Sequence, residues 1–415
     1  MAMMDQWAET AVLNAFGAVR QGVLTVKLPD GRVRTFGNGR GREASIDIHA
    51  PRFFTQVVTG GEVALGDTYM DGWWSSPDLV SLVALMLENR DALGKLPAWL
   101  SWVSRTVEMV AHRMRDNSRS GSVRNIHEHY DLGNDFFSLF LDSRRQYSCA
   151  VYDAAHASLE AAQLNKLRVI CDQLELRPGD RLLEIGTGWG GLAAFAAEEY
   201  GCHVTTTTIS PEQYAYASQL FAQKGLGWRI DLRLEDYRDL KGTFDKIVSV
   251  EMFEAVGLKH YDDFFGACDR LLSPSGAMLM QTITVDDWRF KEYLSTPSWI
   301  AKRIFPGSEL ASVSEILQSL ARVGRLGLHH AQEIGPHYAL TLREWRARFW
   351  ASIDDVRDQG FDERFIRMWD LYLAYCEAAF QEGHIGNVQL MFTKTRKGRL
   401  VTLAQPESEV VAAAK

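Results

Sequence analysis

Four closely spaced glycines, Gly186, Gly188, Gly190 and Gly191, mark the part of the sequence where chemistry is most readily predicted. They follow a short apolar run that is typical of a strand, and an alanine-rich run that favours a helix comes after them. Glycine accepts positive φ and lets a ligand lie against bare backbone at the start of a helix. On its own, such a turn indicates a nucleotide-like ligand without specifying which one.

The acidic residues around this turn indicate the kind of ligand. A dinucleotide site carries Asp or Glu at the end of the second strand, about twenty residues on, to bind a ribose hydroxyl. Here that strand ends in Thr208, Ile209 and Ser210, and Gln213 follows one turn into the next helix. The carboxylate, Glu184, precedes the first glycine instead. This E-x-G-x-G-x-G arrangement is typical of S-adenosylmethionine methyltransferases, whose positively charged cofactor suits a negative charge under the loop.

The composition of the 415-residue chain limits its possible classes. The length favours two domains, and 46% apolar residues suffice for a full core. A net charge of -8 argues against a general nucleic-acid binder. The five cysteines are scattered without disulfide or metal-ligand spacing, so we expect no metal and a reducing, cytoplasmic location. We find neither a secretion signal nor an apolar run of ~18 residues that could span a membrane.

Changes in composition predict four segments. Residues 1–90 combine a strand pair, turned at Pro29-Asp30-Gly31, with an aromatic run, and predict a small mixed α/β domain. In residues 91–125 basic residues outnumber acidic ones by six to three. We interpret this segment as a basic, Trp-containing helix and linker that either rests on an anionic membrane or is simply solvated. Residues 126–405 form the main domain, with an insertion at about 285–325, and residues 406–415 predict a disordered tail.

Strands and helices alternate through the main domain, which predicts a doubly wound, mostly parallel sheet. The last strand is expected to belong to an antiparallel pair at the edge. The expected strands are Leu182 to Ile185, Val204 to Ile209, Ile230 to Leu234, Lys246 to Val250, Ala277 to Ile283 and Val388 to Thr393.

Together with GDTYMDGWW in the first domain, seven motifs, in order over nearly the whole chain, resemble the cyclopropane-fatty-acid synthase family. They are HYDLGNDFF, QYSCAVYD, LLEIGTGWGG, TTISPEQ, EDYRDL, VSVEMFEAVG and IGPHYALTLREW. The resemblance implies a Rossmann-like class I methyltransferase fold with seven mostly parallel strands. It also implies methyl transfer from S-adenosylmethionine to a cis double bond in a membrane phospholipid chain. The resulting carbocation would lose a proton to bound bicarbonate and close a cyclopropane ring.

The resemblance, together with the glycine turn, assigns roles to individual residues. Three positions depart from the family pattern. Gln281 stands where bacterial members typically have His, Glu251 stands where Gly is usual, and Ala255 stands where His is usual. Bicarbonate is expected to contact Cys149, Glu254, Gln281, the Ile283 backbone and Tyr338. The cofactor is expected to contact Tyr147, Ser148, Glu184, Gly186, Gly188, Gly190, Thr208, Ile209, Gln213 and Asp236.

The expected partners are unsaturated phospholipid chains and the inner face of the membrane, contacted peripherally. A homodimer is a further candidate, and no nucleic acid is expected. Three alternatives stay open. The first is a methylene- or methyl-branched product, for which the replacement of His by Gln281 is the reason. The others are methylation of a small molecule and a catalytically silent lipid-binding module. The insertion is expected to cover the site. It either lines a lipid groove, with Trp288, Phe290, Trp299, Ile304 and Phe305, or forms a helical cover over the sheet.

Overall fold

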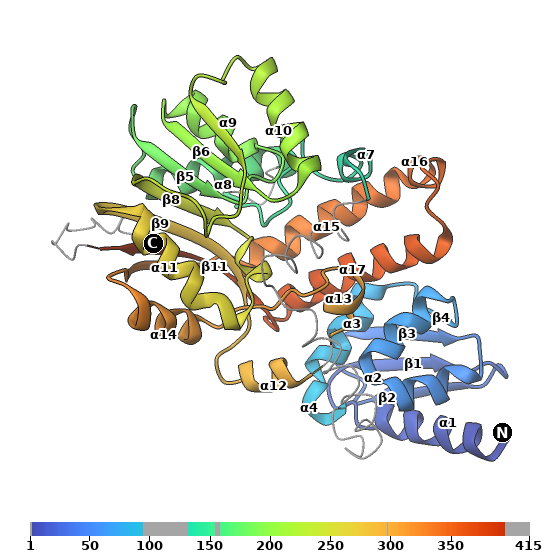
Figure 1. The fold of residues 1–415 in the computed structure, drawn as a ribbon. Coiled ribbons are helices and arrows are strands. Elements are labelled where there is room, and N and C mark those ends of the chain that lie inside the picture. The colour runs from blue at the N-terminus through green and yellow to red at the C-terminus, as the bar shows by residue number, and fades with distance from the viewer. Residues whose placement is uncertain (1, 94–131, 154–157, 297, 395–415) are drawn as a thin grey trace, which may run out of the picture.

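The structure, a computed structural model, describes residues 2–93, 132–153, 158–296 and 298–394. The chain forms two α/β units, and long helices from its C-terminal part lie between them (Figure 1). Most of the segment at 91–125, and the whole tail at 406–415, lie outside the described residues. None of the described helices has the length and apolar character that crossing a membrane requires.

A small mixed sheet forms the centre of the N-terminal unit. Its strands lie in the order β2-β1-β3-β4, and β1 pairs antiparallel with β2 and parallel with β3. Leu24 and Val26 of β1 are buried while their neighbours are partly exposed, as expected for a strand with one face on the core. The elements are α1 (Ala2–Phe16), β1 (Val23–Lys27), β2 (Val33–Gly37), β3 (Glu43–Ile48), α2 (Arg52–Met70), β4 (Trp74–Ser75), α3 (Leu79–Glu88) and α4 (Arg90–Leu93).

A seven-stranded sheet forms the larger unit, in the order β10-β11-β9-β8-β5-β6-β7. Strand β11 pairs antiparallel with both β10 and β9, and the other pairs are parallel. The predicted Rossmann-like methyltransferase fold and the antiparallel edge are therefore confirmed. The strands are β5 (Arg181–Ile185), β6 (His203–Thr208), β7 (Ile230–Leu234), β8 (Phe244–Val250), β9 (Leu272–Thr284), β10 (Gly327–Glu333) and β11 (Gly386–Thr393).

Helices cover both faces of this sheet, because successive side chains of each strand point to opposite sides. Leu183 and Ile185 of β5 pack with helices α11 and α14, whereas Leu182 packs with α8, α9 and α10. The helices are α7 (Asn134–Ser138), α8 (Leu159–Gln173), α9 (Gly191–Glu199), α10 (Pro211–Gln223), η1 (Phe253–Ala255), η2 (Leu258–His260), α11 (Tyr261–Leu271) and α14 (Val313–Val323).

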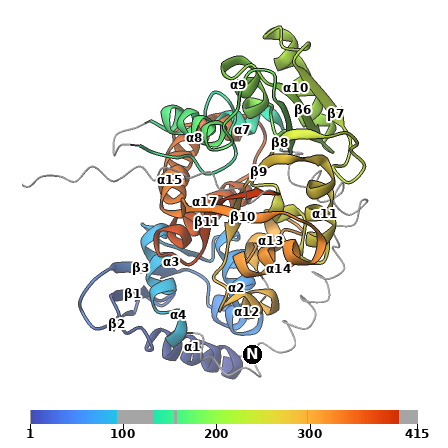
Figure 2. The same ribbon diagram turned by 90° about the vertical axis from the view of Figure 1, so that its left-hand side faces the viewer.

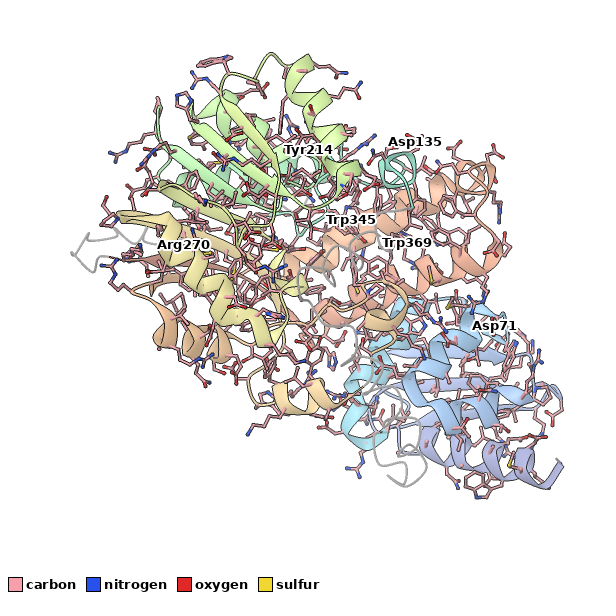
Figure 3. All side chains as sticks on the ribbon, viewed as in Figure 1. Asp71, Asp135, Tyr214, Arg270, Trp345 and Trp369 are labelled. Atoms are coloured by element: carbon pink, nitrogen blue, oxygen red, sulfur yellow. The ribbon has the colours of Figure 1, made fainter. Side chains whose placement is uncertain are left out.

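Helices α15 (Gly335–Ala351), α16 (Ile353–Asp358) and α17 (Glu363–Gln381) connect the two units. Helix α17 packs against α15 on one side and against α2 and α3 on the other, an arrangement that Figure 2 shows from the side. Trp345 of α15 and Trp369 of α17 lie in the middle of the molecule (Figure 3) and belong to a core that continues into the N-terminal sheet. The two units therefore share one core.

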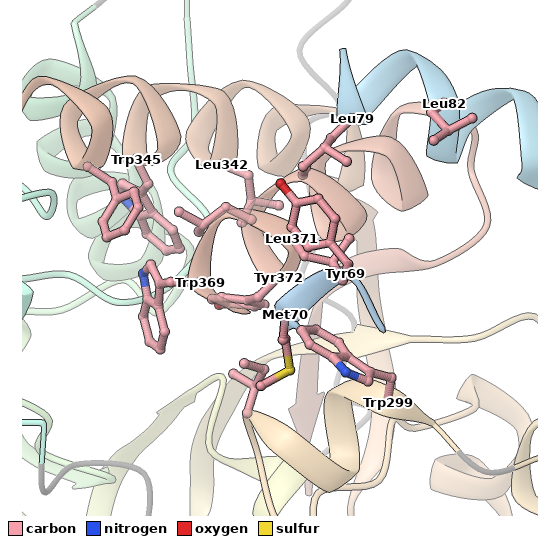
Figure 4. Close-up of a cluster of buried hydrophobic side chains, with 14 of the residues drawn as sticks. Tyr69, Met70, Leu79, Leu82, Trp299, Leu342, Trp345, Trp369, Leu371 and Tyr372 are labelled. Atoms are coloured by element: carbon pink, nitrogen blue, oxygen red, sulfur yellow. The ribbon is translucent and has the colours of Figure 1, made fainter. Parts of the chain in front are cut away.

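The insertion after β9 also packs on the N-terminal unit. It forms α12 (Phe290–Ser295) and α13 (Trp299–Arg303), and α12 lies near α4 (Figure 1), where Glu292 of α12 pairs with Arg90 of α4 at 2.8 Å. Trp299 lies close to Met70 of α2 (Figure 4), and a Cβ at Gly66 would come within 2.4 Å of the Trp299 ring. The glycine in α2 thus makes room for the tryptophan of α13.

Candidate active site

One cavity of about 370 Å³ extends from the carboxyl ends of β5, β6 and β8 into the space between the insertion, α15 and α17. This is the edge of a doubly wound sheet at which ligands bind. Three of the predicted site residues, Cys149, Gly190 and Gln281, do not line it. The remaining ones do: Tyr147, Ser148, Glu184, Gly186, Gly188, Thr208, Ile209, Gln213, Asp236, Glu254, Ile283 and Tyr338.

The glycine turn connects β5 to α9 and forms one wall of the cavity. Gly186, Gly188 and Gly190 have φ values of 99°, 53° and 85°, which favour glycine. A Cβ at Gly188 would meet no atom within 4 Å, so this residue leaves open space for a ligand. A Cβ at Gly190 would lie 2.8 Å from the Phe221 ring. Gly190 is therefore required by packing against α10, and Gly188 is the residue with room for a ligand.

A buried carboxyl group, Glu184, lies under the turn. Its Oε2 accepts a hydrogen bond of 2.5 Å from Thr206 Oγ1. Burial raises the pKa of Glu184 to about 8, although Thr206 and the ammonium group of Lys166 act in the opposite direction. The ammonium group of Lys166 donates hydrogen bonds to Ser148 Oγ at 2.7 Å and to Gln146 Oε1 at 2.9 Å. A positively charged ligand above Glu184 would favour its ionised form.

Short polar groups end the second strand, as the sequence indicates. Thr208 Oγ1 donates to Gln213 Oε1 at 2.9 Å, and Asp236 accepts from the guanidinium group of Arg238 at 2.9 and 2.6 Å. Hydroxyl, amide and carboxylate groups here match a ribose and an adenine base, and Glu184 matches an ammonium or sulfonium group. The chemistry of this half of the cavity therefore fits S-adenosylmethionine.

Glu251, at the end of β8, accepts four hydrogen bonds. Its Oε1 accepts from the backbone N–H of Cys149 at 2.9 Å, from Gln281 Nε2 at 2.8 Å and from Asn387 Nδ2 at 2.7 Å. Its Oε2 accepts from the hydroxyl group of Tyr338 at 2.7 Å. Burial and the adjacent Glu251 raise the pKa of Tyr338 well above its usual value, so the phenol keeps the proton that it donates.

The backbone of Glu251 is in an uncommon conformation. Its φ is 48°, in the left-handed region that favours glycine, and its N–H donates to the carbonyl group of Gln281 at 2.8 Å. A non-glycine residue here costs on the order of 1 to 3 kcal/mol and is concentrated at functional sites. Glycine, the residue that the resemblance leads us to expect at this position, would adopt this conformation without strain.

A second carboxyl group, Glu254, lines the same part of the cavity. Its Oε1 accepts from the backbone N–H of Ile283 at 2.6 Å and from Thr282 Oγ1 at 3.0 Å. Its Oε2 is buried and has no hydrogen-bond partner among the described residues. Burial, and after it the charge of Glu251, raise the pKa of Glu254. The two carboxyl groups thus have different surroundings, and Glu251 has by far the larger number of donors.

Three of the five residues expected to bind bicarbonate, Cys149, Gln281 and Tyr338, donate to Glu251, whereas the backbone of Ile283 donates to Glu254. Cys149 contributes its backbone N–H, while its buried thiol points to the carbonyl groups of Ala150 and Ile334, and burial raises its pKa. Gln281 is oriented by Gln389, whose amide donates to Gln281 Oε1 at 3.0 Å. The carboxylate of Glu251 thus takes the donors of these three residues.

Apolar side chains line the other half of the cavity. They come from the insertion, α15 and α17, and include Ile300, Phe305, Leu342, Tyr372 and Phe380. The expectation for the insertion is only partly met. Phe305 lines the cavity, and Phe290, Trp299 and Ile304 are buried elsewhere. Trp288 is 77% exposed and is not among the residues that line this cavity.

Sequence reasoning missed several residues of this site. Glu251 appeared only as a departure from the usual glycine, which was the one available signal. No sequence signal pointed to Asn387, Arg289 or His384. Asn387 and His384 lie in or near the last strand and Arg289 lies in the insertion, outside all the motifs named above.

Known proteins with similar sequences are lipid-modifying enzymes. The sequence profile of the mycolic acid cyclopropane synthetase family matches residues 117–390. The chain is 39% identical over 365 residues to a tuberculostearic acid methyltransferase from Mycobacterium tuberculosis, covering 86% of this chain and 84% of that protein. It is 40% identical over 351 residues to cyclopropane-fatty-acyl-phospholipid synthase from Escherichia coli K12, and the match covers 85% of this chain and 88% of that protein.

Solved structures with the same fold include two cyclopropane synthases. MmaA2 from Mycobacterium tuberculosis is 30% identical with a TM-score of 0.61, and the match covers 65% of this chain and 97% of that one. The mycolic acid cyclopropane synthase CmaA1, solved in complex with SAH and CTAB, is 32% identical with the same TM-score and the same coverage.

Proposed function

Since the chain belongs to the mycolic acid cyclopropane synthetase family, we propose that it methylates the cis double bond of an unsaturated phospholipid chain and then removes a proton. The methyl donor is S-adenosylmethionine, and the substrate is a lipid acyl chain. The observation that carries the proposal is the carboxylate of Glu251, held by four donors where the polar half of the cavity meets the apolar half.

Residues of the polar half position the methyl donor. S-adenosylmethionine supplies, when bound, an electrophilic methyl group. Glu184 is the candidate for its positive charge, the backbone at Gly186 and Gly188 provides the surface beneath it, and Thr208 with Gln213 provides the polar groups for the ribose and the base. An alkene is a weak nucleophile, so positioning is the main contribution, and it can supply about 7 to 11 kcal/mol of the barrier.

Aromatic side chains of the apolar half protect the cation formed on the acyl chain. Tyr338 and Phe380 stack with their ring centres 4.5 Å apart, and Phe305 also lines the cavity. Aromatic faces attract a cation by about 0.5 to 2 kcal/mol each. Exclusion of water from this space prevents the cation from being trapped as an alcohol.

Glu251 then accepts a proton from the new methyl group. A carboxylate oxygen accepts about two hydrogen bonds, and Oε1 already accepts three. Oε2 accepts only the one from Tyr338, so it keeps a lone pair for the proton. We therefore assign the base to Glu251 Oε2 in place of bicarbonate. Glu254, whose pKa is raised by burial and by the charge of Glu251, holds the backbone of Ile283.

The proposed product is a cyclopropane chain, and a methylene-branched chain is the second candidate. Both require a base at the methyl group, and they differ by a hydride shift before the proton is lost. The second candidate is favoured by the similarity to a tuberculostearic acid methyltransferase. The sequence identity to that enzyme is 39%, and the identity to the cyclopropane synthase is 40%. Peripheral membrane contact and homodimer formation stay predictions, since residues 94–131 lie outside the described part.

The test is to incubate the purified protein with S-adenosylmethionine and a dioleoyl phospholipid, and to analyse the chains by mass spectrometry before and after hydrogenation. A chain heavier by one methylene group that takes up no hydrogen supports the cyclopropane, and one that takes up hydrogen supports the methylene branch. Unchanged lipid, despite cofactor binding measured by calorimetry, would refute the proposal.

A further inference from the structure

A buried arginine, Arg289, lies in the insertion and lines the same cavity. Only 7% of it is exposed. Its Nη1 donates to the carbonyl oxygen of His384 at 3.1 Å, and both terminal nitrogens lie about 3 Å from the His384 ring nitrogens. Its Nε is buried and has no acceptor among the described residues. The guanidinium group therefore keeps an unused donor inside the cavity wall.

The charge of Arg289 has no anionic partner among the described residues, and its guanidinium carbon lies 5.6 Å from the ring centre of the exposed Trp288. Among the residues that the structure describes, no carboxylate forms an ion pair with it, and Glu292, on the next helix, pairs with Arg90 at 2.8 Å. His384 is neutral, because burial and the two arginines lower its pKa to about 3. Burial and the nearby charge of Arg90 lower the pKa of Arg289, and Asp286 and Glu292 act in the opposite direction. Burying an unpaired charge is costly, which indicates that an anionic ligand completes this site.

The surroundings of Arg289 point to an amphiphilic anion. Tyr293, Ile300, Cys376 and Ile385 line the cavity together with it, so a ligand that reaches the guanidinium group also contacts apolar surface. The cofactor half belongs to β5, β6 and α9, at the opposite side of the molecule from α12 (Figure 1). The guanidinium group matches phosphate oxygens in shape and charge.

We propose that Arg289, with the carbonyl group of His384 fixing its orientation, binds the phosphodiester of a glycerophospholipid whose unsaturated chain extends through the apolar half of the cavity toward Glu251. The proposal rests on the proposed function and assigns the substrate its headgroup contact. Arg289 is then a specificity residue: it selects acyl chains that carry a phosphate over neutral acyl lipids.

The experiment compares two substrates with identical chains, dioleoyl phosphatidylglycerol and dioleoylglycerol, in neutral detergent micelles. Methyl incorporation is measured for the full-length protein, for Arg289→Gln and for Lys291→Gln, which removes an exposed positive charge from the same segment. We expect Arg289→Gln to raise KM for phosphatidylglycerol ten-fold or more and to leave KM for dioleoylglycerol unchanged. Lys291→Gln should match the wild type on both lipids.

Equal preference for phosphatidylglycerol in the wild type and in Arg289→Gln would overturn the proposal. So would activation of dioleoylglycerol turnover by inorganic phosphate, which would assign the site to free phosphate. Thermal unfolding and calorimetry with S-adenosylmethionine show whether Arg289→Gln is folded, and Arg289→Lys, which keeps the charge, should recover part of the preference. If the wild type methylates neither lipid, the proposed function fails rather than this assignment.

Discussion

Tyr338 of α15 donates a hydrogen bond of 2.7 Å to Oε2 of Glu251, which stands at the end of β8 with φ of 48°. The two residues come from parts of the chain that only the folded structure brings together. Helix α15 packs on α17, which also supports the N-terminal unit, so the proposed base is held in place by contacts that involve much of the molecule.

Replacing Glu251 by Gln should abolish most activity. The amide keeps the size of the side chain but cannot take a proton, and a positioned base contributes about 10²- to 10⁴-fold. We expect kcat to fall at least 100-fold, with cofactor affinity unchanged in calorimetry. Glu254→Gln is the matched control, and its loss should be clearly smaller. A larger loss in Glu254→Gln would move the role of base to that residue.

Replacing Tyr338 by Phe should lower kcat about ten-fold. The change removes one hydrogen bond to a charged group, worth roughly 1.5 to 3 kcal/mol, and retains the ring that stacks on Phe380. Pre-steady-state measurements with saturating cofactor would locate the effect in the chemical step. An unchanged rate would show that the hydroxyl group does not orient Glu251.

Cofactor binding should release a proton below about pH 8. Burial raises the pKa of Glu184 to about 8 in the free protein, so its carboxyl group is protonated at pH 7, and a cationic ligand favours the ionised form. Affinity should therefore increase as the pH rises toward 8. Calorimetry in buffers of different ionisation enthalpy measures the released proton, and Glu184→Gln should remove that release. Equal proton release by both proteins would contradict this role.

Alanine at two glycines of the turn should have different effects. At Gly190 a Cβ would lie 2.8 Å from Phe221, so Gly190→Ala should lower the melting temperature. At Gly188 the space is open, so Gly188→Ala should chiefly weaken cofactor binding. Both positions have positive φ, which costs roughly 1 to 2 kcal/mol for alanine. Thermal unfolding and calorimetry on both variants would separate the two roles, and identical behaviour would argue against them.

The sequence predicted the fold well because the fold depends on local patterns. Strand β7 lies where the alternation of residues placed it, and the glycine turn stands between β5 and α9. Boundaries were less accurate: β9 begins at Leu272, five residues before the expected strand. Trp288 was one candidate for the lining of a groove because of its residue type, but an aromatic residue can equally lie at the surface, as Trp288 does.

The site was predicted only where residues lie in recognisable motifs. The position of Glu251 depends on donors from the loop at Cys149, from β9, β11 and α15, and no local pattern reports such a convergence. Asn387 and Arg289 likewise acquire their roles from tertiary contacts alone. The resemblance suggested a bicarbonate ion because it implies the usual set of binding residues. It does not report that Glu251, an additional carboxylate, accepts hydrogen bonds from three of them.

The most direct test of the central claim, that Glu251 is an internal base, is the dependence of activity on bicarbonate. In buffer freed of carbon dioxide, the wild-type protein should methylate a dioleoyl phospholipid at full rate. Glu251→Gly, which leaves the four donors without their acceptor, should be nearly inactive there and should regain activity when bicarbonate or formate is added. A wild-type protein that loses activity without bicarbonate, or a Glu251→Gly variant as active as the wild type in its absence, would contradict the account.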